Sequence, residues 1–228
     1  MNKKKTILTL LVGILVFLLI LHNVPKRITE EDKQYLAIIF GGIDMQQEEL
    51  GFEDEIAYLD TLVNHLHQEF YLTPIDYYVA REPKDLYENM GGLCYDFSRT
   101  IEKKLILSGF QTRHVAVYKN SGGFFNTILS PGVFSHSLTE VKTKKGWMII
   151  DSNIPFYAQD VNGVIFNYKQ LADEQKTPNW RLQLDKGLAH FYTPDVVFVY
   201  GLYSRHGGFY SPYNFIPDYN FRELFYNF

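Results

Sequence analysis

The chain has 228 residues, a formal net charge of -4 and a single cysteine. This length is enough for one domain with a substantial core and some attached segments. The weakly acidic balance gives no indication of nucleic-acid binding. One cysteine excludes an intrachain disulfide, and no Cys/His cluster has zinc-site spacing, so the sequence predicts neither a metal nor a cofactor.

The N-terminus combines three lysines with an almost wholly apolar segment over residues 6–22. A signal peptide would need a small-x-small cleavage site soon afterwards, and residues 22–27 offer none. A membrane-spanning helix needs about 17–25 apolar residues, and this segment is at the short end of that range. We predict an uncleaved single-pass anchor, with the domain facing the periplasm or cell exterior. Secretion after signal cleavage is the second choice, and a buried core helix is the third.

The next segment, residues 23–51, is predicted to be a connector. Thr29 and Asp32 form a capping-box pattern before a short helix, which Gly41 and Gly42 end. The domain proper begins near Phe52, where apolar residues repeat at helical spacing and predict a helix over 54–70.

The only cysteine lies in the sequence Gly91-Gly92-Leu93-Cys94. Two glycines predict a sharp turn, and Phe97, Ile101 and Leu105 then predict a helix that runs to about residue 108. A thiol at a helix N-terminus is in a field that favours the thiolate. Free cysteine is also among the most buried residue types, so core packing is the alternative for Cys94 alone.

After this helix the apolar period changes to two, which indicates strands. Strands are predicted over 113–118, 135–141, 147–151 and 196–200. The second and third form a hairpin around Lys144-Lys145-Gly146. Helices followed by strands indicate an α+β fold.

Residues 201–228 are rich in tyrosine and phenylalanine. We predict that this C-terminal segment packs on the domain, because such rings bury large areas. The alternative is that it forms a wall of a substrate groove.

Three residues form a possible catalytic group: Cys94 as nucleophile, His136 as base and Asp151 as the group that orients the base. In a tight hairpin around residues 144–146, two residues face each other across the strands when their residue numbers add up to about 290. His136 then faces a residue near 154, and Asp151 lies within about one pair step of it.

Four sequence segments resemble the transglutaminase-like superfamily in order and spacing. They are Gly92-Leu93-Cys94-Tyr95-Asp96-Phe97, residues 109–115, the histidine strand over 135–141, and Gly146-Trp147-Met148-Ile149-Ile150-Asp151. The resemblance covers about residues 87–153. The chain departs from the family at Ser137-Leu138, where Ala-Trp is common, and at Ser152, where proline is common.

The resemblance implies a papain-like core with Cys94 as nucleophile, His136 as general base and acid, and Asp151 as orienter. It also implies a bacterial thiol enzyme, and it favours the nucleophile interpretation of Cys94 over core packing. The backbone N–H of Cys94 is one expected oxyanion donor, and Gln68 and Tyr71 are the candidates for the second. Arg113, His114, His190 and His206 are expected to be structural, although His206 is also a candidate to line a groove.

The predicted function is cleavage or transfer of an amide or peptide acyl group, with hydrolysis favoured over transamidation. The expected partners are the membrane and a peptide or protein amide, for which cell-envelope material is a candidate source, with no nucleic acid. The alternatives are a non-catalytic module that binds peptides or glycans, and a structural protein of the envelope. The predicted organisation is a cytoplasmic tail (1–5), a transmembrane anchor (6–22), a connector (23–51), a transglutaminase-like domain (52–200) and the aromatic segment (201–228).

Overall fold

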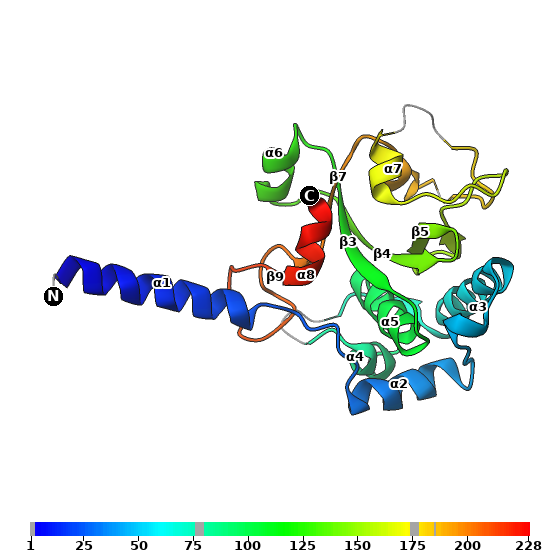
Figure 1. Cartoon of the computed structure of the whole chain (residues 1–228), viewed down its shortest axis with the longest axis horizontal. Helices are drawn as coiled ribbons and strands as arrows, with labels where there is room; N and C mark the ends of the chain where they lie inside the picture. Colours follow the sequence, from blue (N-terminus) through cyan, green and yellow to red (C-terminus); the bar gives the residue numbers. More distant parts are fainter. Residues whose placement is uncertain (1–2, 76–79, 174–177, 185) are drawn as a thin grey trace.

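The computed structural model describes residues 3–75, 80–173, 178–184 and 186–228, and its fold is α+β (Figure 1). Within these residues the helices are α1 (Lys3–Leu21), α2 (Glu30–Phe40), α3 (Phe52–Glu69), α4 (Pro83–Glu88), α5 (Cys94–Leu107), α6 (Phe124–Leu129), α7 (Tyr168–Asp173) and α8 (Phe221–Leu224), with 3-10 turns η1 (Gln47–Glu49), η2 (Ala189–Tyr192) and η3 (Phe225–Asn227). The strands are β1 (Tyr71–Leu72), β2 (Gly91–Gly92), β3 (Thr112–Lys119), β4 (Ser135–Thr143), β5 (Gly146–Asp151), β6 (Phe156–Tyr157), β7 (Val196–Tyr200), β8 (Leu202–Ser204) and β9 (Asp218–Tyr219).

The main sheet has five strands in the order β6-β5-β4-β3-β7, and each neighbouring pair is antiparallel. Two small sheets accompany it, the parallel pair β1-β2 and the antiparallel pair β8-β9. The strands of the main sheet therefore follow the first five helices along the chain, as the change of apolar period predicts.

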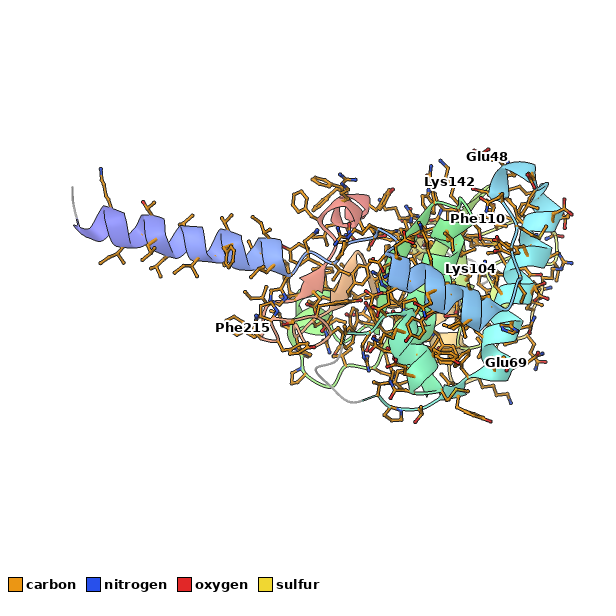
Figure 2. The ribbon with its side chains drawn as sticks, turned by 90° about the horizontal axis from the view of Figure 1, so that it is seen from below. Glu48, Glu69, Lys104, Phe110, Lys142 and Phe215 are labelled. Carbon is orange, nitrogen blue, oxygen red and sulfur yellow. The ribbon has the colours of Figure 1, made fainter. Side chains whose placement is uncertain are left out.

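One face of the main sheet is covered by the N-terminal helices. Val141, Met148 and Ile150 point to this face and share one core cluster with residues of α2, α3 and α5. Figure 2, seen from below, shows α2 lying across α5 and α3, and α2 contacts both helices. The segment predicted as a connector thus supplies α2 to the main core.

The other face carries a second core cluster. Leu138 and Ile149 point to it and pack with residues of α7 and of η2, among them Phe191 and Tyr192. Alternate residues of β5 therefore face opposite layers, as expected for a strand buried on both sides. His136 shares its side of β4 with Leu138, and Asp151 shares its side of β5 with Ile149, since each pair is two residues apart.

The hairpin that carries the two candidate site residues has the predicted register within one position. Thr139 pairs with Ile150 and Thr143 pairs with Gly146, so paired numbers add up to 289 instead of about 290. The antiparallel register therefore places Asp151 diagonally across from His136, within reach of a side-chain hydrogen bond.

The approach to α5 differs from the predicted glycine turn. Gly91 and Gly92 form β2 and pair with β1, while the left-handed backbone residue is Met90, with φ of 53°. A Cβ atom on Gly91 would collide with the carbonyl oxygen of Tyr71, and one on Gly92 would lie 2.5 Å from the Asp96 Cβ. Both positions require glycine because other segments of the same chain lie too close for a side chain, and not because the backbone has a positive φ.

The prediction of a membrane anchor over residues 6–22 is wrong, and so are the membrane helix in the predicted fold class and the single-pass localisation. None of the helices in the described part of the chain is long and apolar enough to span a bilayer. α1 begins at Lys3, so lysines occupy its first turn. Residues 6–21 extend only about 24 Å at 1.5 Å per residue, against a hydrocarbon core of about 30 Å.

The chain after α1 packs directly on the domain. His22, predicted as the last residue of the anchor, is buried, and its Nδ1 lies 3.0 Å from Asp218 Oδ1. Asn23 bridges to Tyr219 in parallel, which ties this segment to the C-terminal residues. Figure 1 shows α1 extending away from this point, while the rest of the chain forms the domain.

Candidate active site

Cys94 is the first residue of α5 and lies partly exposed at the wall of a cavity. The helix is anchored at this end because the Leu93 N–H donates to Asp96 Oδ2 at 2.8 Å. The thiol therefore lies at the positive end of a 14-residue helix, where a negative charge is favoured. As the first helical residue, Cys94 also has a backbone N–H with no acceptor in a preceding turn.

His136 and Asp151 form a buried pair. His136 Nε2 lies 2.8 Å from Asp151 Oδ2, and the two side chains are 3% and 0% exposed. The imidazole has two ring nitrogens, so this bond leaves Nδ1 for a partner on the other side. His136 lines the same cavity as Cys94, whereas Asp151 lies behind the histidine.

The Asp151 carboxylate has two further donors. The Tyr192 hydroxyl donates to Oδ2 at 2.6 Å, and the Asn153 backbone N–H donates to Oδ1 at 2.9 Å. Both carboxylate oxygens are thus engaged, and the plane of the carboxylate is fixed relative to the imidazole. Tyr192 comes from η2, 41 residues after Asp151 in the chain.

Phe191 covers the histidine ring. Its ring is stacked on His136 with centroids 5.1 Å apart and an interplanar angle of 25°. Phe191 is itself fully buried. The His136–Asp151 hydrogen bond therefore lies in a low-dielectric environment, where electrostatic interactions are stronger than in water.

The protonation of His136 follows from this environment. Burial lowers the pKa of the imidazole, but Asp151 and then the side chain of Cys94 outweigh burial and raise the pKa to about 10, from 6.5. The histidine is therefore a cation at neutral pH, with Cys94 as one of the groups close enough to favour its charge.

The cavity beside Cys94 has a volume of about 430 Å³. Aromatic rings from three parts of the chain line it, namely Tyr95 of α5, Tyr118 of β3, and Tyr203 and Phe209 of the C-terminal segment. The C-terminal segment thus packs on the domain and also forms one wall of this cavity. No signal in the sequence indicates which of its many rings face the cavity.

Some of the remaining candidates from the sequence line the cavity beside Cys94, and others do not. Neither Gln68 nor Tyr71 lines the cavity, so the structure does not bring a second oxyanion donor from these positions to Cys94. His114 and His206 do line it. His114 is buried, which lowers its pKa to about 4, and its Nε2 lies 3.1 Å from Ser137 Oγ.

Arg113 lies outside this cavity and is ion-paired with buried Glu140. The Arg113 guanidinium also stacks on Trp147 and Tyr200, 4.3 and 4.2 Å from their ring centroids. In the described parts of the chain, no group of three or more His, Cys, Asp or Glu residues has the arrangement of a metal site.

Comparison with solved structures gives distant similarity only. No protein-family model matches the chain, and neither does any curated protein. A solved structure of a candidate cysteine protease from Cytophaga hutchinsonii is similar over 64% of this chain, with 15% sequence identity and a TM-score of 0.35. The matched region is 49% of that protein, so the chain spans about half of its length.

Proposed function

We propose that this chain is a thiol enzyme that hydrolyses an amide or peptide bond, with Cys94 as nucleophile, His136 as acid and base, and Asp151 as orienting residue. The observation that carries the proposal is the His136–Asp151 hydrogen bond of 2.8 Å, made by a histidine that lines the same cavity as the only cysteine. A nucleophile, a base and a group that orients the base are the components that covalent acyl transfer requires.

In the proposed first step, the Cys94 thiolate attacks the carbonyl carbon and forms a C–S bond. The Cys94 backbone N–H donates to the resulting oxyanion. The C–N bond then breaks, and His136 gives its proton to the leaving amine. The product of this step is a thioester on Cys94 and a free amine.

In the second step, water attacks the thioester carbonyl and His136 takes a proton from it. The C–S bond breaks, which releases a carboxylic acid and restores the thiolate. An amine in place of water would give transamidation. Hydrolysis is favoured because water reaches a partly exposed thiol without a dedicated acceptor site.

The proposal is tested by alkylation of the single cysteine, which gives an unambiguous mass change. We expect iodoacetamide to modify Cys94 at pH 7 at least tenfold faster than it modifies free glutathione, and we expect His136→Gln to remove this advantage. A wild-type rate equal to that of glutathione would contradict an activated nucleophile.

Turnover is tested with a mixed peptide library, using mass spectrometry to detect cleavage. Wild type is expected to cleave members of the library, and Cys94→Ala is expected to cleave none. Equal cleavage by both proteins would exclude Cys94 as nucleophile. Peptide binding without cleavage, unchanged in a Cys94→Ala, His136→Ala double variant, would instead support a non-catalytic binding module.

A further inference from the structure

The charges around the cavity that contains Cys94 are unbalanced. Among the described residues that line it there are two arginines, Arg81 and Arg205, and no aspartate or glutamate. Arg81 is buried and has an acidic partner behind the wall, since its Nε lies 3.5 Å from Asp96 Oδ1. Arg205 has no carboxylate within ion-pair distance in the described portion of the chain, so its charge is unmatched.

Arg205 is held in place by neutral groups. Its Nη1 donates to the backbone oxygens of Thr127, Ile128 and Ser130 at 3.2, 3.1 and 3.0 Å. Its guanidinium also lies over the ring of Tyr118, 5.0 Å from the centroid. Nε and Nη2 make no hydrogen bond with the described residues, so their N–H groups remain available as donors to a ligand.

Tyr118 connects this cation with the candidate nucleophile. Burial is the main cause that raises the pKa of Tyr118 to about 12, Arg205 opposes the rise and Cys94 adds to it. Tyr118, Arg205 and Cys94 all line the same cavity, and Tyr118 is in contact with the Arg205 guanidinium. A molecule bound at Arg205 lies beside the Tyr118 ring and within the same cavity as the Cys94 thiol.

We propose that Arg205 forms a carboxylate-binding subsite, and that the acyl donor of this enzyme carries a carboxylate next to an apolar or aromatic segment. This inference rests on the proposed function and adds the substrate class. A guanidinium with free N–H donors suits a carboxylate, and the aromatic walls suit the segment that joins the carboxylate to the scissile carbonyl. A substrate cation in this position would instead face Arg205, Arg81 and protonated His136.

The first test compares two alkylating agents of nearly equal size, iodoacetate and iodoacetamide. The ratio of their second-order rate constants at Cys94 reports the preference for a carboxylate. We expect Arg205→Gln to lower this ratio by about fivefold, the factor that corresponds to one close charge pair in solvent. Arg222→Gln, an exposed arginine of α8 outside this cavity, is expected to leave the ratio unchanged.

A second variant distinguishes loss of the carboxylate subsite from misfolding, because Arg205→Gln also removes hydrogen bonds to three backbone carbonyl oxygens. His206 is exposed, lines the cavity and follows Arg205 in the chain. His206→Asp supplies a competing carboxylate without removing Arg205 and is expected to lower the same ratio. An unchanged ratio in both variants would overturn the subsite. An equal fall of both rate constants would show that Arg205 only supports the fold.

The third test does not depend on a reactive thiol. In Cys94→Ala, phenylacetate at millimolar concentration is expected to raise the melting temperature more than phenylacetamide does, and Arg205→Gln is expected to abolish the difference. Equal effects of the two compounds would reject a carboxylate site. An unreactive Cys94 combined with selective binding of phenylacetate would reject the enzyme and retain the anion site.

Discussion

Tyr192 and Asp151 are joined by a hydrogen bond of 2.6 Å, and the oxygen that accepts it is the one that accepts the His136 ring N–H. Tyr192 is 1% exposed, so this bond is made away from water. The tyrosine does not line the cavity. Its role toward the proposed reaction is therefore to position the carboxylate.

The first prediction concerns this hydroxyl. Tyr192→Phe keeps the ring and its packing but removes the donor, so we expect the rate of Cys94 alkylation at pH 8 to fall by about 3- to 10-fold, equivalent to one typical hydrogen bond. We also expect the inflection caused by His136 in the pH–rate profile to move to higher pH, because Asp151 Oδ2 then pairs with the imidazolium alone.

The control is Tyr226→Phe. Its ring packs on Trp147 and Tyr200, and its hydroxyl has no partner among the residues that the structure describes. A Tyr192 variant that loses stability while the inflection stays in place would show a packing role only.

The second prediction concerns the pH dependence of stability. The pKa of His136 rises from 6.5 in the unfolded chain to about 10 in the folded protein. The folded state therefore binds a proton that the unfolded state loses, and this contribution is complete below pH 6.5 and is lost as pH rises through 10. We expect the free energy of unfolding to fall over this window by on the order of a few kcal/mol.

Asp151→Asn removes the main cause of the raised pKa. Urea denaturation at pH 6.5, 8 and 9.5 is expected to show a weaker fall with pH in this variant than in wild type. Asp60→Asn, at an exposed position of α3, is expected to retain the wild-type slope. Identical slopes for wild type and Asp151→Asn would contradict a charged His136–Asp151 pair.

Local patterns predicted the parts of the site that are close in sequence. The helical repeat after Cys94 and the hairpin around residues 144–146 gave elements whose ends agree with the structure within one or two positions. The hairpin register then placed Asp151 beside His136. In the structure Asp151 Oδ2 lies 2.8 Å from His136 Nε2, at the position that the hairpin register predicts, because register follows from turn geometry.

These local patterns do not predict contacts between segments that are distant in the sequence. Phe191 and Tyr192 lie in a short 3-10 turn with no periodicity, and only the folded chain shows that they cover His136 and Asp151. Arg205 likewise lies in an irregular aromatic segment. The membrane prediction failed for a related reason, since hydropathy counts apolar residues but does not show where the helix starts or that His22 is buried in the domain.

The third prediction concerns the approach to α5. In Gly91→Ala the new methyl group meets the Tyr71 carbonyl oxygen, and backbone cannot move away as a flexible side chain does. We expect a loss of about 1–3 kcal/mol in the free energy of unfolding, the usual cost of overpacking. Because β2 leads directly into Cys94, alkylation by iodoacetamide is also expected to slow.

The control is Gly13→Ala, where the added methyl group meets nothing within 4 Å. A helical Gly→Ala change without a clash stabilises by up to about 1 kcal/mol. A Gly91 variant as stable and as reactive as wild type would show that β1 and β2 separate freely.

The fourth prediction concerns Arg99 of α5, a buried cation that contacts residues from several other parts of the chain. Arg99 is fully buried and donates to both carboxylate oxygens of Glu82 at 3.1 Å and to the Pro25 carbonyl oxygen at 2.9 Å. Its Nη1 lies 3.4 Å from buried Glu102, which also accepts from Tyr203 of the cavity wall. Removing the Arg99 charge leaves the carboxylate of Glu102, which is buried away from water, with less opposite charge to stabilise it.

Arg99→Met keeps most of the side-chain volume and removes the charge. We expect it to lower the free energy of unfolding by about 3–5 kcal/mol in urea denaturation at pH 7, as is usual when one partner of a buried ion pair is lost. Arg222→Met on the exposed face of α8 is expected to change it by less than about 0.5 kcal/mol. A small loss for Arg99→Met would mean that Lys26, 3.0 Å from Glu102, compensates that carboxylate alone.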